Sequence, residues 1–530
     1  MTHAPGNASR RERMTPHGDL VLGFDVGTSA VKAALFDAEG RMHGSARAGY
    51  PTRYPAPGHA EQDPHEWWRA MTSATCELLA SVPQARESIA AIGIAAQVCG
   101  TVPVDAAGEP LHPCLIWLDT RSAPIAREIT GGGPRIGGYG IFRLPGWLRL
   151  ANGAPNLAGK DPLSKIVWFR AALPEVGRRA ARFLDVKDWL LHRCTGRYAT
   201  TPDVAQLTWL MDNRVGRRDW SDAYLARFEL TRDQLPQIVE PAATAGTLTA
   251  AAAETLGLPA GLPVSGGVGD INAAALAAGD YAQGAYHLSI GTSQWFGAHT
   301  PRRRVSPLTG IATICAAHPD RYLLVAAQES AGAAALWAAS AFGYGAGSAG
   351  LQALDGHASE AAPGADTPLF APWLFGERVP VSEASACGAL AGATLRTTRA
   401  DIAYSVLAGI ALNARWALTE AERCVASSTA TIRLIGGAAR SAVWRQIVAD
   451  MLQRPLLTME SPEFGGAKGA AMTAAVSVGW YRSLDDASVM ARTGVAVEPQ
   501  RFRQAWADQR YGELVSFWRS TRRWHRERVS

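Results

Sequence analysis

The stretch Asp25-Val-Gly-Thr-Ser-Ala-Val-Lys32 decides the fold of this 530-residue chain. One apolar run, 20–24, leads into it, and a second, 31–36, overlaps its end and continues beyond it. Two apolar runs separated by a turn at Gly27 and Thr28 predict a β-hairpin.

The side chains of this turn suit an anion. Gly27 lets the backbone approach a bound group, and Thr28 and Ser29 supply hydroxyl donors. Lys32 adds a compact positive charge. Asp25 would hold Mg²⁺ rather than touch a phosphate, because two negative groups repel unless a metal lies between them. From these residues alone, a hairpin turn with a solvated lysine is the alternative.

Two later segments repeat the pattern of a strand that runs into a glycine turn. The strand from His287 to Ile290 reaches Gly291-Thr292-Ser293, and the strand from Thr431 to Ile435 reaches Gly436-Gly437-Ala-Ala-Arg-Ser441. A nucleoside triphosphate held between two lobes needs donors from both, and the last turn leaves room for a ribose and adenine before a helix N-terminus. Three such turns predict an α/β fold of two lobes with the nucleotide in the cleft between them.

Composition indicates a folded globular protein of about two domains. The residues are 47% apolar and 19% charged, and 530 residues exceed what one core usually supports. The net charge is only +5, with 52 basic residues scattered among 47 acidic ones, so nucleic acid is not indicated as a partner. Seven cysteines without a Cys-x-x-Cys pair favour a reducing cytoplasm over disulfides or zinc. No apolar run of about 18 residues occurs, so no membrane span is predicted.

The domain boundaries follow from these patterns. Residues 1–19 are polar and are predicted to be a flexible extension. An N-terminal lobe is expected over 20–278 and a C-terminal lobe over 285–490, with the boundary near 278–286. Residues 491–530 are expected to be a C-terminal extension with helical character.

Asp270 is the candidate general base. It follows Gly266-Gly-Val-Gly269, a flexible run that can bring the backbone close to a substrate, and it lies near the expected join of the lobes. Transfer of a phosphoryl group needs a carboxylate within roughly 3 Å of the attacking hydroxyl. The alternative is a helix cap, because 273–278 has helical character and aspartate is a favoured N-cap.

Four separated motifs, in one order, resemble the FGGY family of carbohydrate kinases, and most closely its xylulokinase branch. They are the segments 25–32, Gly269-Asp270, Gly291-Thr292 and 436–441. The resemblance extends from about residue 20 to residue 480. It implies an actin-like, ribonuclease-H-like fold, with sugar bound mainly by the first lobe and ATP mainly by the second.

The resemblance also implies roles for individual residues. Asp270 would be the catalytic base and Asp25 would serve Mg²⁺. The residues expected at the nucleotide are Thr28, Ser29, Lys32, Gly291, Thr292, Gly436, Gly437 and Ser441. The residues expected at the sugar are Gln97, Val98, Cys99, Asp119, Arg121, Asp270 and Ile271.

The expected sugar pocket departs from the pattern of the xylulokinase branch. There a Met-His-Gly follows the glutamine, whereas Gln97 is followed by Val98-Cys99-Gly. The residue after the base is usually a polar Asn or Gln, whereas here it is Ile271, with Asn272 one place further on. A buried sugar hydroxyl left without a partner costs about 1 to 3 kcal/mol. The natural acceptor therefore need not be D-xylulose, and Cys99 is expected to be a small buried filler.

Two charged segments have open interpretations. Asp119 and Arg121 could bind a polyol, pair with each other, or cap a helix that starts at Ser122. The segment Gly376-Glu-Arg378 resembles a family feature of the second lobe, where a structural ion pair is expected.

The leading hypothesis is transfer of the γ-phosphate of Mg-ATP to a terminal hydroxyl of a ketopentose or related polyol, with ATP and Mg²⁺ as cofactors. The alternatives are a family kinase for another acceptor (ribulose, glycerol or an erythritol-like polyol) and a non-catalytic sugar- and nucleotide-binding sensor on the same fold. An ATPase without a sugar pocket would leave the segment 117–121 unexplained. Family precedent suggests a homodimer.

Overall fold

The computed structural model describes residues 18–306 and 309–527, so nearly all of the expected extension over 1–19 lies outside the described residues. The described chain forms two compact units. Unit 1 comprises residues 18–279, Cys315–Asp320 and Gly466–Arg492, and unit 2 comprises Asp280–Ile314, Arg321–Gly465 and residues 493–527. The first break, between Gly279 and Asp280, lies within the range 278–286 considered above.

The sheet of unit 1 is built around the predicted hairpin. β1 (Leu20–Val26) and β2 (Ala30–Phe36) pair antiparallel. β5 (Ile89–Ala96) lies parallel to β1, and all eight of its residues are buried. A strand covered on both faces needs a continuous apolar run, which this segment supplies. The order along the sheet is β15-β16-β5-β1-β2-β3, and β17 (Val268–Gly269) also pairs with β5.

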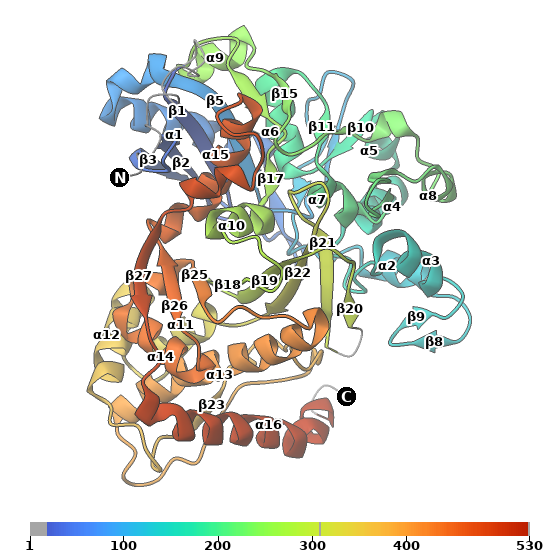
Figure 1. Ribbon diagram of the computed structural model, residues 1–530. Helices are drawn as coiled ribbons and strands as arrows, with labels where there is room; N and C mark the ends of the chain where they lie inside the picture. The colour runs from blue at the N-terminus through green and yellow to red at the C-terminus, as the bar shows by residue number, and fades with distance from the viewer. Residues whose placement is uncertain (1–17, 307–308, 528–530) are drawn as a thin grey trace, which may run out of the picture. The chain divides into compact units, whose positions relative to one another are not determined.

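Helix α1 (Pro64–Ser81) begins with a capped first turn. The Asp63 side chain accepts a hydrogen bond from the backbone N–H of His65, and proline occupies the first turn. Trp67 and Trp68 lie on its buried face within the core of unit 1. Trp67, Met71, Ala74 and Leu78 recur at helical spacing on this buried face, and the helix packs against β2 and β3 (Figure 1).

Unit 2 repeats the arrangement. β18 (Tyr286–Ile290) and β19 (Gln294–Thr300) form an antiparallel hairpin, and β25 (Ile432–Ile435) lies parallel to β18. The order along this sheet is β20-β21-β22-β19-β18-β25-β26-β27. In each unit, a hairpin is thus followed, later in the chain, by a strand parallel to its first strand. The two halves have related topologies.

The structure corrects the expected C-terminal lobe over 285–490. Helix α15 (Gly465–Ser477) packs in unit 1, where Figure 1 shows its red ribbon beside the blue strands. A Cβ on Gly23 would lie 1.9 Å from the Ala467 carbonyl oxygen, and one on Gly93 would lie 2.0 Å from that of Ala470. These glycines of β1 and β5 allow the helix backbone to approach the sheet, a long-range contact that no local pattern reveals.

The expected extension over 491–530 is also more integrated than the sequence indicates. β27 (Thr493–Val497) is an edge strand of the sheet of unit 2, and α16 (Gln504–Glu527) buries Ala507, Leu514 and Trp518 in the core of that unit. Residues 528–530 lie outside the described residues. The described part of this segment therefore belongs to unit 2.

The other elements complete the two units. The remaining helices of unit 1 are α2 (Ala123–Thr130), α3 (Leu144–Ala151), α4 (Pro162–Ala172), α5 (Pro174–Arg179), α6 (Val186–Thr195), α7 (Pro202–Ala205), α8 (Asp222–Arg227), α9 (Ala250–Leu256) and α10 (Asp270–Ala278). Those of unit 2 are α11 (Gly332–Ala341), α12 (Gly347–Glu360), α13 (Arg399–Val425) and α14 (Ala442–Leu452). The remaining main-sheet strands are β3 (Met42–Gly49), β15 (Thr244–Thr247), β16 (Pro263–Ser265), β20 (Val305–Ser306), β21 (Ile311–Cys315), β22 (Tyr322–Gln328) and β26 (Leu456–Met459). Short strands are β4 (Glu61–Gln62), β6 (Val102–Val104), β7 (Cys114–Leu115), β8 (Arg135–Ile136), β9 (Tyr139–Gly140), β10 (Arg182–Leu184), β11 (Ala199–Thr200), β12 (Met211–Asp212), β13 (Asp219–Trp220), β14 (Gln237–Ile238), β23 (Leu369–Ala371) and β24 (Ala389–Ala391).

Candidate active site

Polar segments of unit 1 meet at the carboxyl edge of its parallel strands. Ala96, the last residue of β5, is paired with Val26 of β1 and with Gly269 of β17. The turn after β1, Gln97 after β5 and Asp270 after β17 therefore start from the same edge. In open α/β sheets this edge is where ligands bind.

Asp25 and Lys32 face each other across the hairpin. Asp25 Oδ2 lies 3.5 Å from Lys32 Nζ, and both side chains are partly buried. Burial raises the pKa of Asp25 above its ordinary value, although the charge of Lys32 and its hydrogen bond oppose the increase. A carboxylate in this position gains from any further cation that approaches it.

Three side chains bond to the first turn, two to its backbone and one to the Thr28 hydroxyl. The Tyr50 hydroxyl donates to the Gly27 carbonyl, and Gln62 Nε2 donates to the Thr28 carbonyl at 2.7 Å. Trp117 Nε1 donates to Thr28 Oγ1 at 3.1 Å. Because an indole can only donate, the Thr28 hydroxyl is the acceptor there and keeps its own proton for another partner. Ser29 is exposed at the tip of the turn.

Asp270 is the first residue of α10, and the N-cap is Gly269. The cap interpretation of Asp270 is therefore wrong, although its Oδ1 accepts from the Ile271 backbone N–H at 2.9 Å. Burial, together with the negative charges of Asp25 and Asp203, raises the pKa of Asp270 to about 7. A carboxyl group with this pKa can take up a proton and release it near neutral pH.

A buried aspartate that the sequence analysis missed supports this segment. Asp203 Oδ2 accepts from the Gly269 N–H at 2.8 Å, and Asp203 Oδ1 accepts from the Thr201 hydroxyl at 2.6 Å. Gly267 has φ of +71°, and a Cβ there would lie 2.1 Å from the Ile94 carbonyl oxygen. The glycine run thus lets β17 lie against β5, which brings Asp270 to the sheet edge.

The expected sugar-side residues 97–99 follow β5 directly. Gln97 is buried and donates from Nε2 to Gln62 Oε1 at 2.7 Å. Cys99 has φ of +64°, and its carbonyl accepts from Lys165 Nζ at 2.7 Å. Burial raises the pKa of the Cys99 thiol well above its usual range, so the group stays protonated, although the residue is half-buried rather than the fully buried filler expected from the sequence. Lys165, fully buried, also donates to the Ile116 carbonyl at 2.8 Å.

Asn272 does not supply the polar group that Ile271 lacks. Its Nδ2 donates to the Cys315 carbonyl at 3.1 Å, and its Oδ1 accepts from the Ala317 N–H at 2.8 Å. The side chain is buried and holds the segment Cys315–Asp320 within unit 1. The position after Asp270 therefore presents an apolar side chain.

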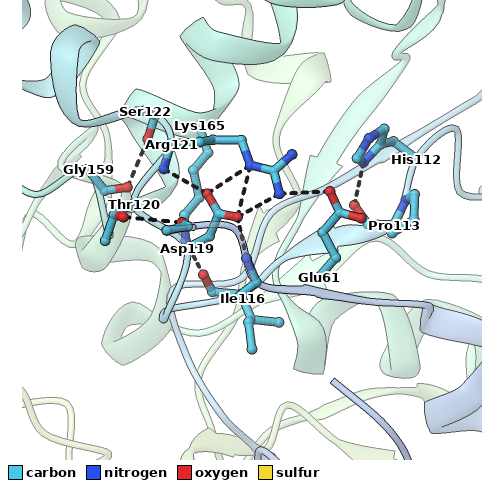
Figure 2. A network of polar contacts seen from close by, with 12 residues as sticks. Glu61, His112, Pro113, Ile116, Asp119, Thr120, Arg121, Ser122, Gly159 and Lys165 are labelled. Carbon is cyan, nitrogen blue, oxygen red and sulfur yellow. Dashed lines mark hydrogen bonds and ion pairs between the residues drawn. The ribbon is translucent and has the colours of Figure 1, made fainter. Parts of the chain in front are cut away.

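Asp119 and Arg121 pair with each other, one of the three interpretations left open by the sequence. Asp119 is fully buried and accepts from Arg121 Nε at 2.9 and 3.0 Å and from the Ala60 N–H at 2.7 Å. Figure 2 shows the Arg121 guanidinium between the carboxylates of Asp119 and Glu61, at 2.7 Å from each. These contacts hold the segment Ala60–Glu61 against the residues that precede helix α2.

The second turn lies at the end of β18 and is held by backbone. The Thr292 carbonyl accepts from the N–H groups of Ala331 and Ala333 at 3.1 and 3.0 Å. The Gly291 carbonyl accepts from Gly332 N–H at 2.9 Å. The turn is exposed, so the hydroxyl groups of Thr292 and Ser293 are accessible to solvent.

The third turn follows β25, which is parallel to β18, so both turns of unit 2 start from one sheet edge. Gly436 has φ of +90°, and a Cβ there would lie 2.5 Å from the Ile290 carbonyl oxygen. A Cβ on Gly437 would meet nothing within 4 Å. Ser441 Oγ accepts from Trp444 N–H at 3.0 Å and is the N-cap of α14. The Ser441 side chain thus has a structural partner at the position expected to line the nucleoside.

Glu377 is buried, and the structural ion pair expected at the segment 376–378 is made by Arg378 rather than by Glu377. Its carboxylate accepts from the N–H groups of Glu329 and Arg378 at 2.9 and 2.8 Å and from Asn413 Nδ2 at 2.7 Å. Arg378 pairs instead with Glu329, at 2.7 Å. Burial raises the pKa of Glu377 to about 8.

Within residues 18–306 and 309–527, no three His, Cys, Asp or Glu side chains are grouped so that they could hold a metal ion. In the same residues, no helix combines the length and apolar character needed to cross a bilayer. Any Mg²⁺ at Asp25 would therefore take most of its ligands from phosphate and water.

Comparison with known proteins agrees with this geometry. Residues 20–277 match the model of the FGGY family of carbohydrate kinases, N-terminal domain, and residues 287–478 match that of the C-terminal domain. The chain belongs to the FGGY family of carbohydrate kinases. It is accordingly an enzyme, a sugar kinase, and the expected two-domain actin-like fold is confirmed.

The relatives include kinases with different names. The chain is 31% identical to xylulose kinase of Escherichia coli over 476 residues, 88% of this chain and 91% of that protein. It is 30% identical to glycerol kinase of Dechloromonas aromatica over 511 residues, 94% and 96% of the two chains. A solved structure of a xyloylose kinase from Brucella ovis matches with a TM-score of 0.83 and 28% identity, covering 95% and 99% of the two chains. Overall similarity of this size does not distinguish a ketopentose from glycerol.

Proposed function

We propose that this kinase transfers the γ-phosphate of ATP to a terminal hydroxyl of a ketopentose or related small polyol, with Asp270 as general base. The observation that carries the proposal is the shared edge of β1, β5 and β17. That edge bears a charged anion-binding turn, an amide and a carboxyl group whose pKa is near 7. An acceptor hydroxyl bound there would have its base and its orienting group on adjacent strands.

Asp270 removes the proton of the attacking hydroxyl. Its raised pKa makes it a better base near neutral pH than an ordinary carboxylate, and the Asp203 contact to Gly269 holds the start of α10 in place. The Ile271 N–H bond to Oδ1 leaves Oδ2 for the substrate. Gln97, which follows the neighbouring strand β5, orients the sugar.

The turn 25–32 binds the transferred phosphate. The Thr28 hydroxyl, already an acceptor from Trp117, donates its proton to a phosphate oxygen, and Lys32 supplies positive charge. Thr292, Gly291, Gly436 and Gly437 bind the remainder of ATP from unit 2. The carboxylate of Asp25 fits Mg²⁺, a hard cation that accepts one protein carboxylate with phosphate oxygens. Bound Mg²⁺ would neutralise charge on the phosphates.

The acceptor is a small polyol, and the part of it that lies near residues 98, 99 and 271 has few polar groups. Val98 and Ile271 offer no hydrogen bonds, and Asn272 is already satisfied elsewhere. A panel of xylulose, ribulose, glycerol, erythritol and aldoses in an ADP-release assay tests this directly. Absence of acceptor-dependent ADP release across the panel would contradict the proposed function.

Replacing Asp270 by asparagine tests the base. We expect Asp270→Asn to lower kcat by about 10²- to 10⁴-fold with ATP binding retained in calorimetry, because only proton removal is lost. Asp222→Asn is the control: it makes the same chemical change in unit 1 at a side chain that is 78% exposed. Wild-type turnover in Asp270→Asn would remove Asp270 from this role.

A further inference from the structure

Gln62 lies at the centre of a buried hydrogen-bond chain beneath the first turn. It is fully buried, and its Nε2 donates to the Thr28 carbonyl and to Thr52 Oγ1, both at 2.7 Å. Its Oε1 accepts from Trp67 Nε1 at 2.9 Å and from Gln97 Nε2 at 2.7 Å. Both protons and both lone pairs of the amide are therefore used.

The chemistry of the partners fixes which way the Gln62 amide faces. The Trp67 indole can only donate, so it requires the Gln62 oxygen. The Thr28 carbonyl can only accept, so it requires the Gln62 nitrogen. Both partners therefore require the same orientation of the Gln62 amide. The shape of the amide alone would not distinguish its oxygen from its nitrogen.

The orientation of Gln62 determines that of Gln97. Because Gln62 presents its oxygen, Gln97 must present its nitrogen, and its Oε1 faces away from Gln62. That oxygen is buried, and among the described residues it has no hydrogen-bond partner. Gln97 follows β5 at the sheet edge where Asp270 follows β17. A buried acceptor left unpaired is costly, and a hydroxyl that donates to it removes the cost.

We propose that Trp67 and Gln62 form a polarity relay that presents Gln97 to the acceptor substrate as a hydrogen-bond acceptor. The inference rests on the proposed function and deepens it, since it specifies that one substrate hydroxyl must donate at this place. Gln97 contacts the substrate, whereas Gln62 and Trp67 are positioning residues. Gln62 also joins this site to the phosphate turn through the Thr28 carbonyl.

Acceptor analogues that each lack one hydroxyl test the relay. In the wild-type enzyme, removal of the hydroxyl that pairs with Gln97 should raise the acceptor KM about 5- to 30-fold. In Gln97→Met the same removal should have no further effect, and in Gln62→Met its effect should shrink to less than about threefold. Equal sensitivity to every missing hydroxyl in wild type, Gln62→Met and Gln97→Met would overturn the relay.

Two tryptophan substitutions distinguish an effect on the orientation of Gln62 from an effect on packing. Trp67→Phe removes the indole donor to Gln62, and Trp68→Phe is a matched control in the same helix. We expect Trp67→Phe, but not Trp68→Phe, to weaken the dependence on that hydroxyl. Equal effects of the two would overturn the role of Trp67, and if Trp67→Phe does not fold, the analogue series in Gln62→Met still decides. An inactive wild-type enzyme would instead contradict the proposed function.

Discussion

The hairpins β1–β2 and β18–β19 occupy the same place in their two sheets, yet their turns are built differently. Residues 27–30 lie between the paired Val26 and Val31, whereas only 291–293 lie between Ile290 and Gln294. Where unit 1 has Asp25 opposite Lys32, unit 2 has Ser289 opposite Trp295. The charged pair is thus confined to one of two otherwise equivalent positions.

The supports of the two turns differ in the same way. The first turn has backbone bonds, among them Tyr50 N–H to the Ser29 carbonyl at 3.2 Å, and is held in addition by side chains of Tyr50, Gln62 and Trp117. The bonds from the start of α11 to the second turn come from backbone N–H groups. Side-chain bonds can orient a hydroxyl and hold a charge in place, whereas backbone bonds mainly fix the path of the chain. This difference favours the proposed assignment of the charged turn and of the base, Asp270, to unit 1.

Among substitutions in the two hairpins, Asp25→Asn should have the largest effect on kcat/KM. We expect kcat/KM to fall at least about 100-fold. The substitution removes the carboxylate that pairs with Lys32 and that is proposed to bind Mg²⁺. Ser289→Ala, at the equivalent position of the second hairpin, should change kcat/KM by less than about threefold. Initial rates over a Mg²⁺ titration measure both, and similar losses in the two variants would contradict the asymmetry.

The pH dependence of kcat/KM should also originate in unit 1, at Asp270. Asp270 must be ionised to accept a proton, so with a pKa of about 7 we expect kcat/KM to fall about tenfold per pH unit below that value. The charge of Asp25 contributes to the raised pKa, so a cation bound there should move the acid limb to lower pH. Rate profiles at low and high Mg²⁺ check this sign. A flat profile between pH 5.5 and pH 8 would contradict it.

The sequence predicts the parts of this fold that local patterns encode. The hairpin at Asp25 is confirmed because turn residues and apolar runs act over short distances. The placement of α15 in unit 1 is not predictable in this way. It depends on Gly23 and Gly93, which meet the helix more than 370 residues later in the chain.

The site shows the same limit. Asp25 and Asp270 come from motifs, and the structure brings the ends of β1 and β17 to one edge. Asp203, Gln62 and Lys165 were missed because their importance lies in partners distant in sequence, although a lysine within the apolar run 162–169 was a signal. The roles assigned to individual residues at the sugar and the nucleotide stay predictions.

Glu377 holds the segment that leads to α11, and the start of α11 holds the second turn. Substitution of Glu377 should change the stability of the protein rather than the rate of catalysis. Glu377 accepts from the Glu329 N–H, three residues before the start of α11. Its pKa of about 8 exceeds the ordinary 4.5, so between these values the folded state binds more protons than the unfolded state and stability falls as pH rises. Glu377→Gln should reduce this slope by up to about 1.4 kcal/mol per pH unit.

Urea denaturation at pH 5, 6.5 and 8 measures the slope of the free energy of unfolding. Glu329→Gln is the control, since it changes a partly exposed glutamate whose backbone N–H bonds to Glu377. An unchanged slope in Glu377→Gln would show that Glu377 does not carry the pH dependence. Loss of the slope in both variants would assign it to the pair rather than to the buried carboxyl group.

The smallest expected effect concerns Ser441, at the end of the third turn. Its Oγ caps α14 by accepting from Trp444 N–H, so Ser441→Ala should cost about 1 kcal/mol of stability. If the hydroxyl also contacts the nucleoside, KM for ATP should rise in Ser441→Ala, whereas Ser441→Asp should restore the cap without restoring that contact. A lower Tm with unchanged KM would make the cap the whole role of Ser441. The second unit would then bind the nucleoside through the open backbone at Gly437, as its phosphate turn is held by backbone rather than by side chains.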